Sequence, residues 1–158
     1  MGIAVKPKTP KKINANVKAL IKELGFGVRQ PKYLNYTHRS PTYKATYCFN
    51  NCEDEAKKTA CEVVYGWMIW EDKKAEFIEA EFHSVIKEDG KLIDISPRQT
   101  GEDKILFITD RDRPSGRKRP DTWYSYTNLK MHRGIVAEES RECEIVELDN
   151  IHSELRFV

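Results

Sequence analysis

The strongest constraint on the fold is an alternating stretch near the middle of the chain. Even positions from 78 to 86 carry apolar or small residues, and positions 79, 81 and 83 carry Glu, Glu and His. A period of two is typical of a β-strand with one face against a core. Turn residues occupy positions 88–90, and residues 91–96 form a further short strand that stops at Pro97. The pattern predicts an antiparallel hairpin.

Two helices are predicted upstream of this hairpin. From Asn14, apolar residues at positions 17, 20, 21 and 24 follow the helical period, and Gly25 is a natural stop. In residues 49–61 the acidic side chains come first and the lysines later, which suits the helix dipole. This second helix is predicted to begin near Cys48 or Asn50.

Further strands are expected at residues 63–70, 105–109, 142–148 and 153–158, where β-branched and aromatic residues concentrate. Helices early in the chain and strands later indicate an α+β fold, with N-terminal helices packed on an antiparallel sheet. The length of 158 residues fits one domain. We expect a flexible basic arm at residues 1–12 and a single globular domain at residues 13–158.

Composition narrows the class of protein. With 39% hydrophobic and 33% charged residues, the chain is globular rather than disordered. No apolar stretch approaches the ~20 residues that span a bilayer, and none resembles a signal peptide. We therefore expect a cytoplasmic protein without membrane contact, whose four cysteines are reduced.

Two basic segments offer an alternative function. The net charge is only +2, but lysines and arginines cluster locally, either as solvated surface or as a contact for nucleic acid or another polyanion. They are Lys6, Lys8, Lys11 and Lys12 in the arm, and Arg111, Arg113, Arg117, Lys118 and Arg119 in a later loop. A non-catalytic binding protein would use these segments to hold nucleic acid or a protein partner.

Cys48, His83 and Asp94 form the candidate catalytic set. Cys48 lies at a predicted helix start, where unpaired backbone N–H groups and the positive dipole end stabilise a thiolate. A histidine within reach of the thiol acts as base and then as acid. A turn centred on residues 88–89 places His83 opposite Asp94, whereas a turn centred on residues 89–90 leaves the two diagonal. Cys52 or Cys61 is an alternative nucleophile.

Residues 46–98 resemble the papain-like core of transglutaminases, NlpC/P60 peptidases and arylamine N-acetyltransferases. The similarity lies in a cysteine at a helix start, then Gly66 in an aromatic strand, His83 in the next strand, and a Gly-containing turn before Asp94 and Pro97. The resemblance implies a papain-like fold with a Cys48 nucleophile, a His83 base and an Asp94 orienter. It implies a thiol hydrolase or transglutaminase-like acyl transferase that acts on a peptide or another acyl-bearing substrate without a cofactor.

Other residues are assigned around this set. Asn51, Glu81, Trp67 and His38 are candidate substrate-binding residues, although Asn51 also suits a helix cap and Trp67 a core position. A zinc site is a further alternative, because cysteines and a histidine are its common ligands. Its ligand set would be Cys48, Cys52, Cys61 and His83. The preferred interpretation assigns no metal.

Overall fold

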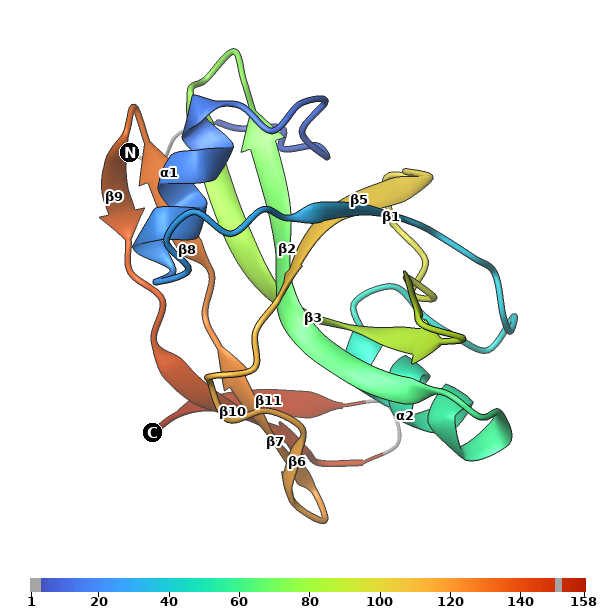
Figure 1. Ribbon diagram of the computed structural model, residues 1–158. Helices are drawn as coiled ribbons and strands as arrows, with labels where there is room; N and C mark the ends of the chain where they lie inside the picture. The colour runs from blue at the N-terminus through green and yellow to red at the C-terminus, as the bar shows by residue number, and fades with distance from the viewer. Residues whose placement is uncertain (1–3, 150–151) are drawn as a thin grey trace.

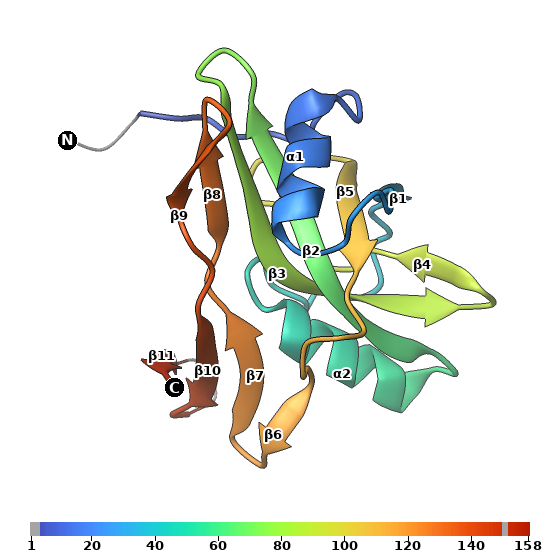
Figure 2. The same cartoon turned by 60° about the vertical axis from the view of Figure 1, so that its left-hand side comes forward.

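The computed structural model describes residues 4–149 and 152–158 and is mostly antiparallel β-sheet (Figures 1 and 2). Strands account for 43% of the structure and two helices for 13%. The predicted α+β, papain-like class with N-terminal helices packed on a sheet is therefore wrong. The expected helices and strands form, but additional strands between residues 117 and 138 shift the balance to β-structure.

The larger sheet has seven strands, and the order β1-β5-β2-β3-β8-β9 runs across it, with β4 paired to β3 off this path. All of its strand pairs are antiparallel. Its strands are β1 (Lys32–Asn35), β2 (Glu62–Asp72), β3 (Phe77–Glu88), β4 (Lys91–Ile93), β5 (Lys104–Thr109), β8 (Leu129–His132) and β9 (Ile135–Glu138). The long β2–β3 hairpin is the centre of this sheet. The predicted hairpin is the one formed by β3 and β4, and it is confirmed.

The smaller sheet has the order β11-β10-β7-β6. Its strands are β6 (Arg117–Arg119), β7 (Thr122–Tyr126), β10 (Glu142–Glu147) and β11 (Ser153–Phe157). The β7–β8 and β9–β10 connections lie side by side, because the Thr127 amide of the first donates to the Arg141 carbonyl oxygen of the second at 2.9 Å. Strands β8 and β9 thus continue the direction of β7 and β10, and the two sheets are joined at this bend (Figure 2).

Helix α1 (Ala15–Glu23) begins where the sequence predicts, because the Asn14 side chain accepts a hydrogen bond from the Val17 amide at 3.0 Å. Its buried residues pack over β3 and share one core cluster with apolar residues of the β2–β3 hairpin. Helix α2 (Cys48–Lys58) packs against β3 further along the strand. Trp123 of β7 is buried in the same core, so both sheets share it.

The β3–β4 turn resolves the two possible registers of the hairpin. Asp89 (φ 51°) and Gly90 (φ 77°) both have positive φ, as a two-residue type I′ turn requires. Glu88 pairs with Lys91, so the turn is centred on residues 89–90. This is the register that places His83 and Asp94 diagonally.

The N-terminal segment contacts the body of the protein at several points. Lys8 pairs with Glu71 through two backbone hydrogen bonds of 2.9 and 2.7 Å, and the Thr9 hydroxyl donates to Glu102 at 2.5 Å. The backbone amide of Lys6 donates to the Asp72 carboxylate. Residues 6–9 of the predicted flexible arm are thus attached to the end of β2 and the start of β5. No helix in the described part of the chain is long and apolar enough to cross a membrane.

Candidate active site

Helix α2 begins beside an unpaired stretch of β3. Strand β3 pairs with β8 up to Ala80 and with β4 from Ile86. Within residues 4–149 and 152–158, no strand pairs with this edge of β3 between those two positions. Cys48 is the first residue of α2, and its thiol reaches this gap.

The gap leaves a peptide group of β3 free to contact the thiol. Tyr65 of β2 lies opposite Ser84, and its carbonyl oxygen accepts a hydrogen bond from Asp110 on the far side. Tyr65 and Ser84 are therefore a non-hydrogen-bonded pair, and Ser84 directs its own N–H away from β2 toward α2. That N–H stabilises the Cys48 thiolate and lowers the pKa of Cys48. By the same alternation, the peptide groups of Phe82 also face the gap.

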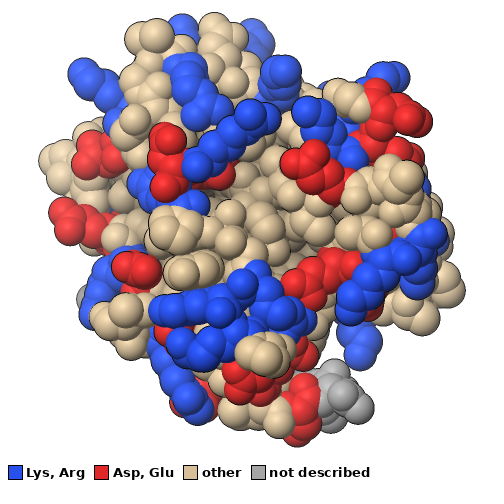
Figure 3. Space-filling view, turned by 60° about the horizontal axis from the view of Figure 1, so that its bottom comes forward, with Lys and Arg blue, Asp and Glu red and all other residues tan. Residues whose placement is uncertain are grey.

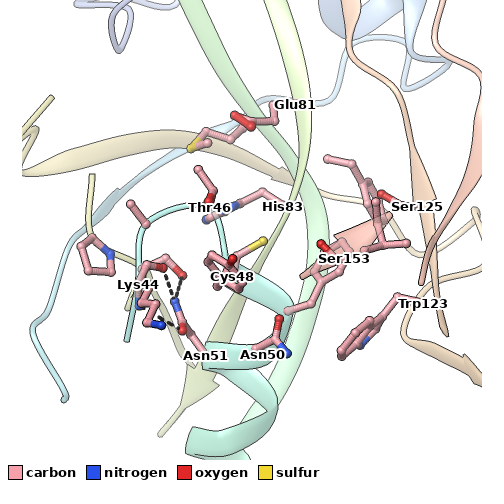
Figure 4. A pocket seen from close by; sticks show the side chains of 18 of the residues that line it. Lys44, Thr46, Cys48, Asn50, Asn51, Glu81, His83, Trp123, Ser125 and Ser153 are labelled. Carbon is pink, nitrogen blue, oxygen red and sulfur yellow. Dashed lines mark hydrogen bonds between the residues drawn. The ribbon is translucent and has the colours of Figure 1, made fainter. Parts of the chain in front are cut away.

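His83 and Asp94 are joined despite their diagonal register. Nε2 of His83 lies 3.1 Å from Oδ1 of Asp94, and both side chains are buried. Asp94 lies just outside the β3–β4 ladder, and its backbone is bound at the end of β1. The Asp94 amide donates to the Asn35 carbonyl oxygen, and the Asp94 carbonyl oxygen accepts from the Thr37 amide. Because Asp94 occupies Nε2, the imidazole has Nδ1 left for the Cys48 thiol (Figure 4).

Arg98 completes the buried charge network. Its Nη2 donates to Oδ2 of Asp94 and lies 3.2 Å from Nε2 of His83. Both nitrogens are donors, so the short separation reflects two groups that share one carboxylate rather than a bond between them. The Arg98 side chain is only 7% exposed. Asp94 therefore has one cationic partner at each oxygen.

The pKa shifts agree on a thiolate–imidazolium pair. Burial alone raises the pKa of Cys48, but the charge of His83 and hydrogen bonds from His83 and Ser84 hold it below its ordinary value. Burial alone lowers the pKa of His83, but the Cys48 thiolate and the bond to Asp94 raise it to about 9. Each group thus stabilises the charged form of the other, and the ion pair is the stable form at pH values between the pKa of Cys48 and the pKa of His83.

The other cysteines do not share this environment. Burial raises the pKa of the Cys52 thiol well above its usual value and also raises the pKa of the Cys143 thiol, which favours the neutral form of both. Cys61 is partly exposed and lies after the end of α2. Among the four cysteines, the electrostatics therefore favour Cys48 as the nucleophile.

Cys48 and His83 open onto a cleft of about 650 Å³, whereas Asp94 is fully buried and does not line it. One wall comes from residues 42–51 at the start of α2, and the other from Trp123 and Ser125 of β7 (Figure 4). Glu81 and His83 of β3 lie between these walls. Phe82 also lines the cleft, so its unpaired peptide groups are next to the space in front of Cys48.

The predicted substrate-binding residues have different positions. Glu81 lines the cleft, whereas Trp67 is fully buried and donates its indole N–H to Asp110 at 2.9 Å. His38 is exposed, 3.4 Å from the Tyr36 hydroxyl, and is not part of the cleft. Asn51 lines the cleft, but it is buried and bound to its neighbours.

The Asn51 side-chain amide holds the loop before α2, residues 42–47, in place at the cleft. Its Nδ2 donates to the Lys44 carbonyl at 2.9 Å and to the Ser96 hydroxyl at 3.0 Å, and its Oδ1 accepts from the Lys44 amide. Thr46, in this loop, has φ of 69°, which is a strained value for a β-branched residue. Asn51 is therefore a residue that fixes the approach to Cys48.

The sequence prediction did not include Arg98, Ser84 or Trp123. Arg98 follows Asp94 by four positions, and a buried carboxylate needs a nearby counter-charge, so a search for that partner could have found it. The role of the Ser84 amide depends on which edge of β3 is unpaired. Trp123 reaches the cleft from the smaller sheet, which no local pattern indicates.

Much of the second basic segment is paired with acidic side chains. On the face drawn in Figure 3, basic groups lie next to acidic ones. The pairs are Arg113 with Asp110, Arg117 with Glu53 and Glu147, and Lys118 and Arg119 with Glu144. These contacts supply no support for a polyanion-binding surface at those residues. Nucleic-acid binding stays a prediction.

Within the described ranges, no group of three His, Cys, Asp or Glu side chains is placed to hold a metal ion. The zinc alternative built on Cys48, Cys52, Cys61 and His83 thus has no assembled ligand set there.

The chain matches no protein-family model, no curated protein and no solved structure. The resemblance of residues 46–98 to thiol hydrolases and acyl transferases therefore stays a prediction. Any function must be argued from the side chains around Cys48.

Proposed function

We propose that the protein is a cysteine-dependent hydrolase or acyl transferase that acts on an amide or other acyl bond through Cys48, His83 and Asp94. The observation that carries the proposal is the contact between Cys48 and His83 in the cleft, which lowers the pKa of Cys48 and raises the pKa of His83. Oδ1 of Asp94 lies 3.1 Å from Nε2 of the same histidine. A thiolate stabilised by imidazolium is the reactive form of a catalytic cysteine.

The chemistry follows in two steps. The Cys48 thiolate attacks the carbonyl carbon, and an oxyanion forms as the C–S bond is made. The imidazolium of His83 then donates its proton to the leaving amine or alcohol, whose bond to carbon breaks, and a thioester remains. In the second step His83 removes a proton from water or an acceptor amine, which attacks the thioester and releases Cys48.

The start of α2 supplies the groups that stabilise the oxyanion. The N–H groups of the first turn, at residues 48–50, have no acceptor within the helix, and the first intrahelical bond comes from the Asn51 amide to Tyr47. Residues 48–50 line the cleft, and their N–H groups belong to the positive end of the helix dipole, next to the nucleophile. Such donors, already oriented, are a large part of catalysis in acyl transfer.

The buried pair of Asp94 and Arg98 has a positioning role. Asp94 accepts from Nε2–H, which fixes the ring orientation and directs Nδ1 to the thiol. Arg98 neutralises the second carboxylate oxygen. This arrangement lets Asp94 hold His83 without the full cost of an isolated buried charge.

The first test is the rate of iodoacetamide labelling at each cysteine as a function of pH, resolved by peptide mass spectrometry. We expect Cys48 to react fastest and to stay reactive below the pH at which an ordinary thiol, of pKa about 8.5, loses its thiolate. His83→Ala should shift the Cys48 profile to higher pH. Equal rates at Cys48 and Cys61, unchanged by His83→Ala, would rule out the ion pair.

A second test separates a reactive thiol from an acyl-transfer site. With p-nitrophenyl acetate, the thiolate displaces p-nitrophenolate and forms an acetyl thioester, which water then hydrolyses. We expect a burst of one p-nitrophenolate per chain followed by slower turnover. Cys48→Ser should abolish the burst, whereas Cys61→Ser, a cysteine outside the cleft, should keep it. A burst that survives Cys48→Ser would contradict the assignment.

A further inference from the structure

Glu81 is the charged residue of β3 that lies closest to His83 on the same strand face. Successive side chains alternate along a strand, so positions 81 and 83 share a face and lie about 6.5–7 Å apart. Glu81 is half-buried and lines the cleft. Its Oε1 accepts a hydrogen bond from the indole N–H of Trp70 at 3.1 Å, which fixes the carboxylate in place.

The walls beside Glu81 are apolar and aromatic. Met68 and Trp70 of β2 lie next to it across the hairpin and also line the cleft. Met68 belongs to the buried cluster on this face of the sheet, with Trp70 packed against it. A carboxylate at the side of an aromatic and thioether wall matches an alkylammonium group, whose carbon chain packs on the wall and whose charge meets the carboxylate.

The cationic side chains that line the cleft are not paired with Glu81. Within the described ranges, no Lys, Arg or His nitrogen lies within 4.0 Å of its carboxylate. Arg98 is bound to Asp94. A half-buried carboxylate without a counter-ion is stabilised when a ligand supplies one.

The other acidic residues of the cleft are less suited to this role. Glu147 already pairs with Arg117, and Asp149 pairs with His152. Asp54 lines the cleft but is exposed, so water solvates its charge. Among the described residues that line the cleft, only Glu81 combines partial burial, a fixed orientation and a position next to the catalytic histidine.

We infer that the cleft selects substrates with an alkylammonium group, such as a lysine side chain, next to the reacting carbonyl, and that Glu81 binds this group against Met68 and Trp70. The inference rests on the proposed function, because it describes the substrate of the same nucleophile. It makes Glu81 a specificity residue that does not take part in the chemical step.

Charged thiol reagents test this selectivity without knowledge of the natural substrate. We would compare three methanethiosulfonates at pH 7.5: the neutral methyl, the cationic 2-aminoethyl and the anionic 2-sulfonatoethyl reagent. In each reaction the Cys48 thiolate attacks the sulfenyl sulfur, a mixed disulfide forms, and methanesulfinate leaves with the electron pair. Rates at Cys48 and Cys61 are read separately by peptide mass spectrometry, so that Cys61 serves as the internal reference.

Glu81→Gln is the informative variant, since the amide oxygen still accepts the Trp70 hydrogen bond while the charge is lost. Glu79→Gln is its matched control. Glu79 lies two positions away on the same strand face, is bound to Asn128 at 3.2 Å and does not line the cleft. Thermal unfolding of each variant verifies that it folds.

The wild type should react faster with the cationic than with the anionic reagent at Cys48. At the distance between neighbouring positions of one strand face, a unit charge changes the ratio of the cationic to the anionic rate by roughly tenfold. Glu81→Gln should therefore reduce this ratio at Cys48 by about that factor at low salt. Glu79→Gln should change it less than about twofold, and the ratio at Cys61 should stay constant.

Two outcomes would overturn the inference, and they are distinguishable. If Cys48 reacts rapidly with the neutral reagent but Glu81→Gln alters the charge ratio no more than Glu79→Gln, the alkylammonium site is refuted and the proposed function stands. If Cys48 reacts with the neutral reagent no faster than Cys61, the thiolate itself is absent and both proposals fail.

Discussion

Asp94→Asn perturbs both the stability and the chemistry of the site. The Asp94 carboxylate is fully buried, binds Nε2 of His83 at 3.1 Å and pairs with Arg98. Asparagine keeps the shape but removes the charge, so the Arg98 guanidinium, 7% exposed, loses its counter-ion. Removal of one partner from a buried ion pair costs about 3–5 kcal/mol. We expect a loss of this size in the free energy of unfolding at pH 7, measured by urea denaturation.

The loss should depend on pH in a defined direction. Burial raises the pKa of Asp94, but His83 and Arg98 outweigh it and hold the pKa below its ordinary value. A depressed carboxyl pKa contributes stability above the unfolded value of about 3.9, and this stability is lost as the pH falls through the native value. The difference in the free energy of unfolding between wild type and Asp94→Asn should therefore have its maximum value at pH 7 and decrease below about pH 4.

The same substitution should shift the reactivity of Cys48. Without Asp94, the pKa of His83 falls from about 9, and the thiolate loses part of its stabilisation. The iodoacetamide profile of Cys48 should move to higher pH. Arg98→Met in the Asp94→Asn background removes the uncompensated charge, so the double variant should lose less stability than the two single losses combined. A loss below about 1 kcal/mol with an unchanged Cys48 profile would refute the reasoning.

Three further outcomes are expected. Gly66→Ala would place a Cβ 2.1 Å from the Ile108 carbonyl oxygen, so β2 and β5 must separate, and urea denaturation should show a loss of about 3 kcal/mol. Asn51→Ala leaves buried hydrogen-bonding partners unpaired and should cost about 1–3 kcal/mol in the same assay. Because His83 loses its proton at about pH 9, acyl transfer should fall above that pH while Cys48 alkylation does not; parallel profiles would contradict the acid role of His83.

Much of the secondary structure was predictable because its signals are local. Asn14 as a cap, the apolar spacing of α1 and the charge order of α2 are visible within single turns of helix. The alternation in β3 and a turn within residues 88–90 likewise need only neighbouring residues, whereas the structure decided that the turn is centred on residues 89–90. The fold class was wrong because the strands β6, β7, β8 and β9 are three to five residues long, too short for a clear period of two.

The candidate site was predictable to the extent that its residues depend on local position. A cysteine at a helix start and a histidine two positions after Glu81 can be recognised in the sequence. The place of Trp67 could not be decided between core and cleft, because its indole N–H binds Asp110, a residue 43 positions away in the chain. Arg98 and the exposed position of His38 also depend on how the loops fold back on the sheet.

The sequence by itself determined which residues could carry thiol chemistry, and that Cys48 begins a helix and His83 lies in a strand. Only the tertiary structure decided that they meet. In the part of the chain that the structure describes, no strand pairs with the edge of β3 between Ala80 and Ile86, so α2 can bring Cys48 to the Ser84 amide and to His83. Strand pairing joins residues far apart in the chain, and no local pattern states where one partner strand ends and the next begins. That missing pairing leaves room for the nucleophile.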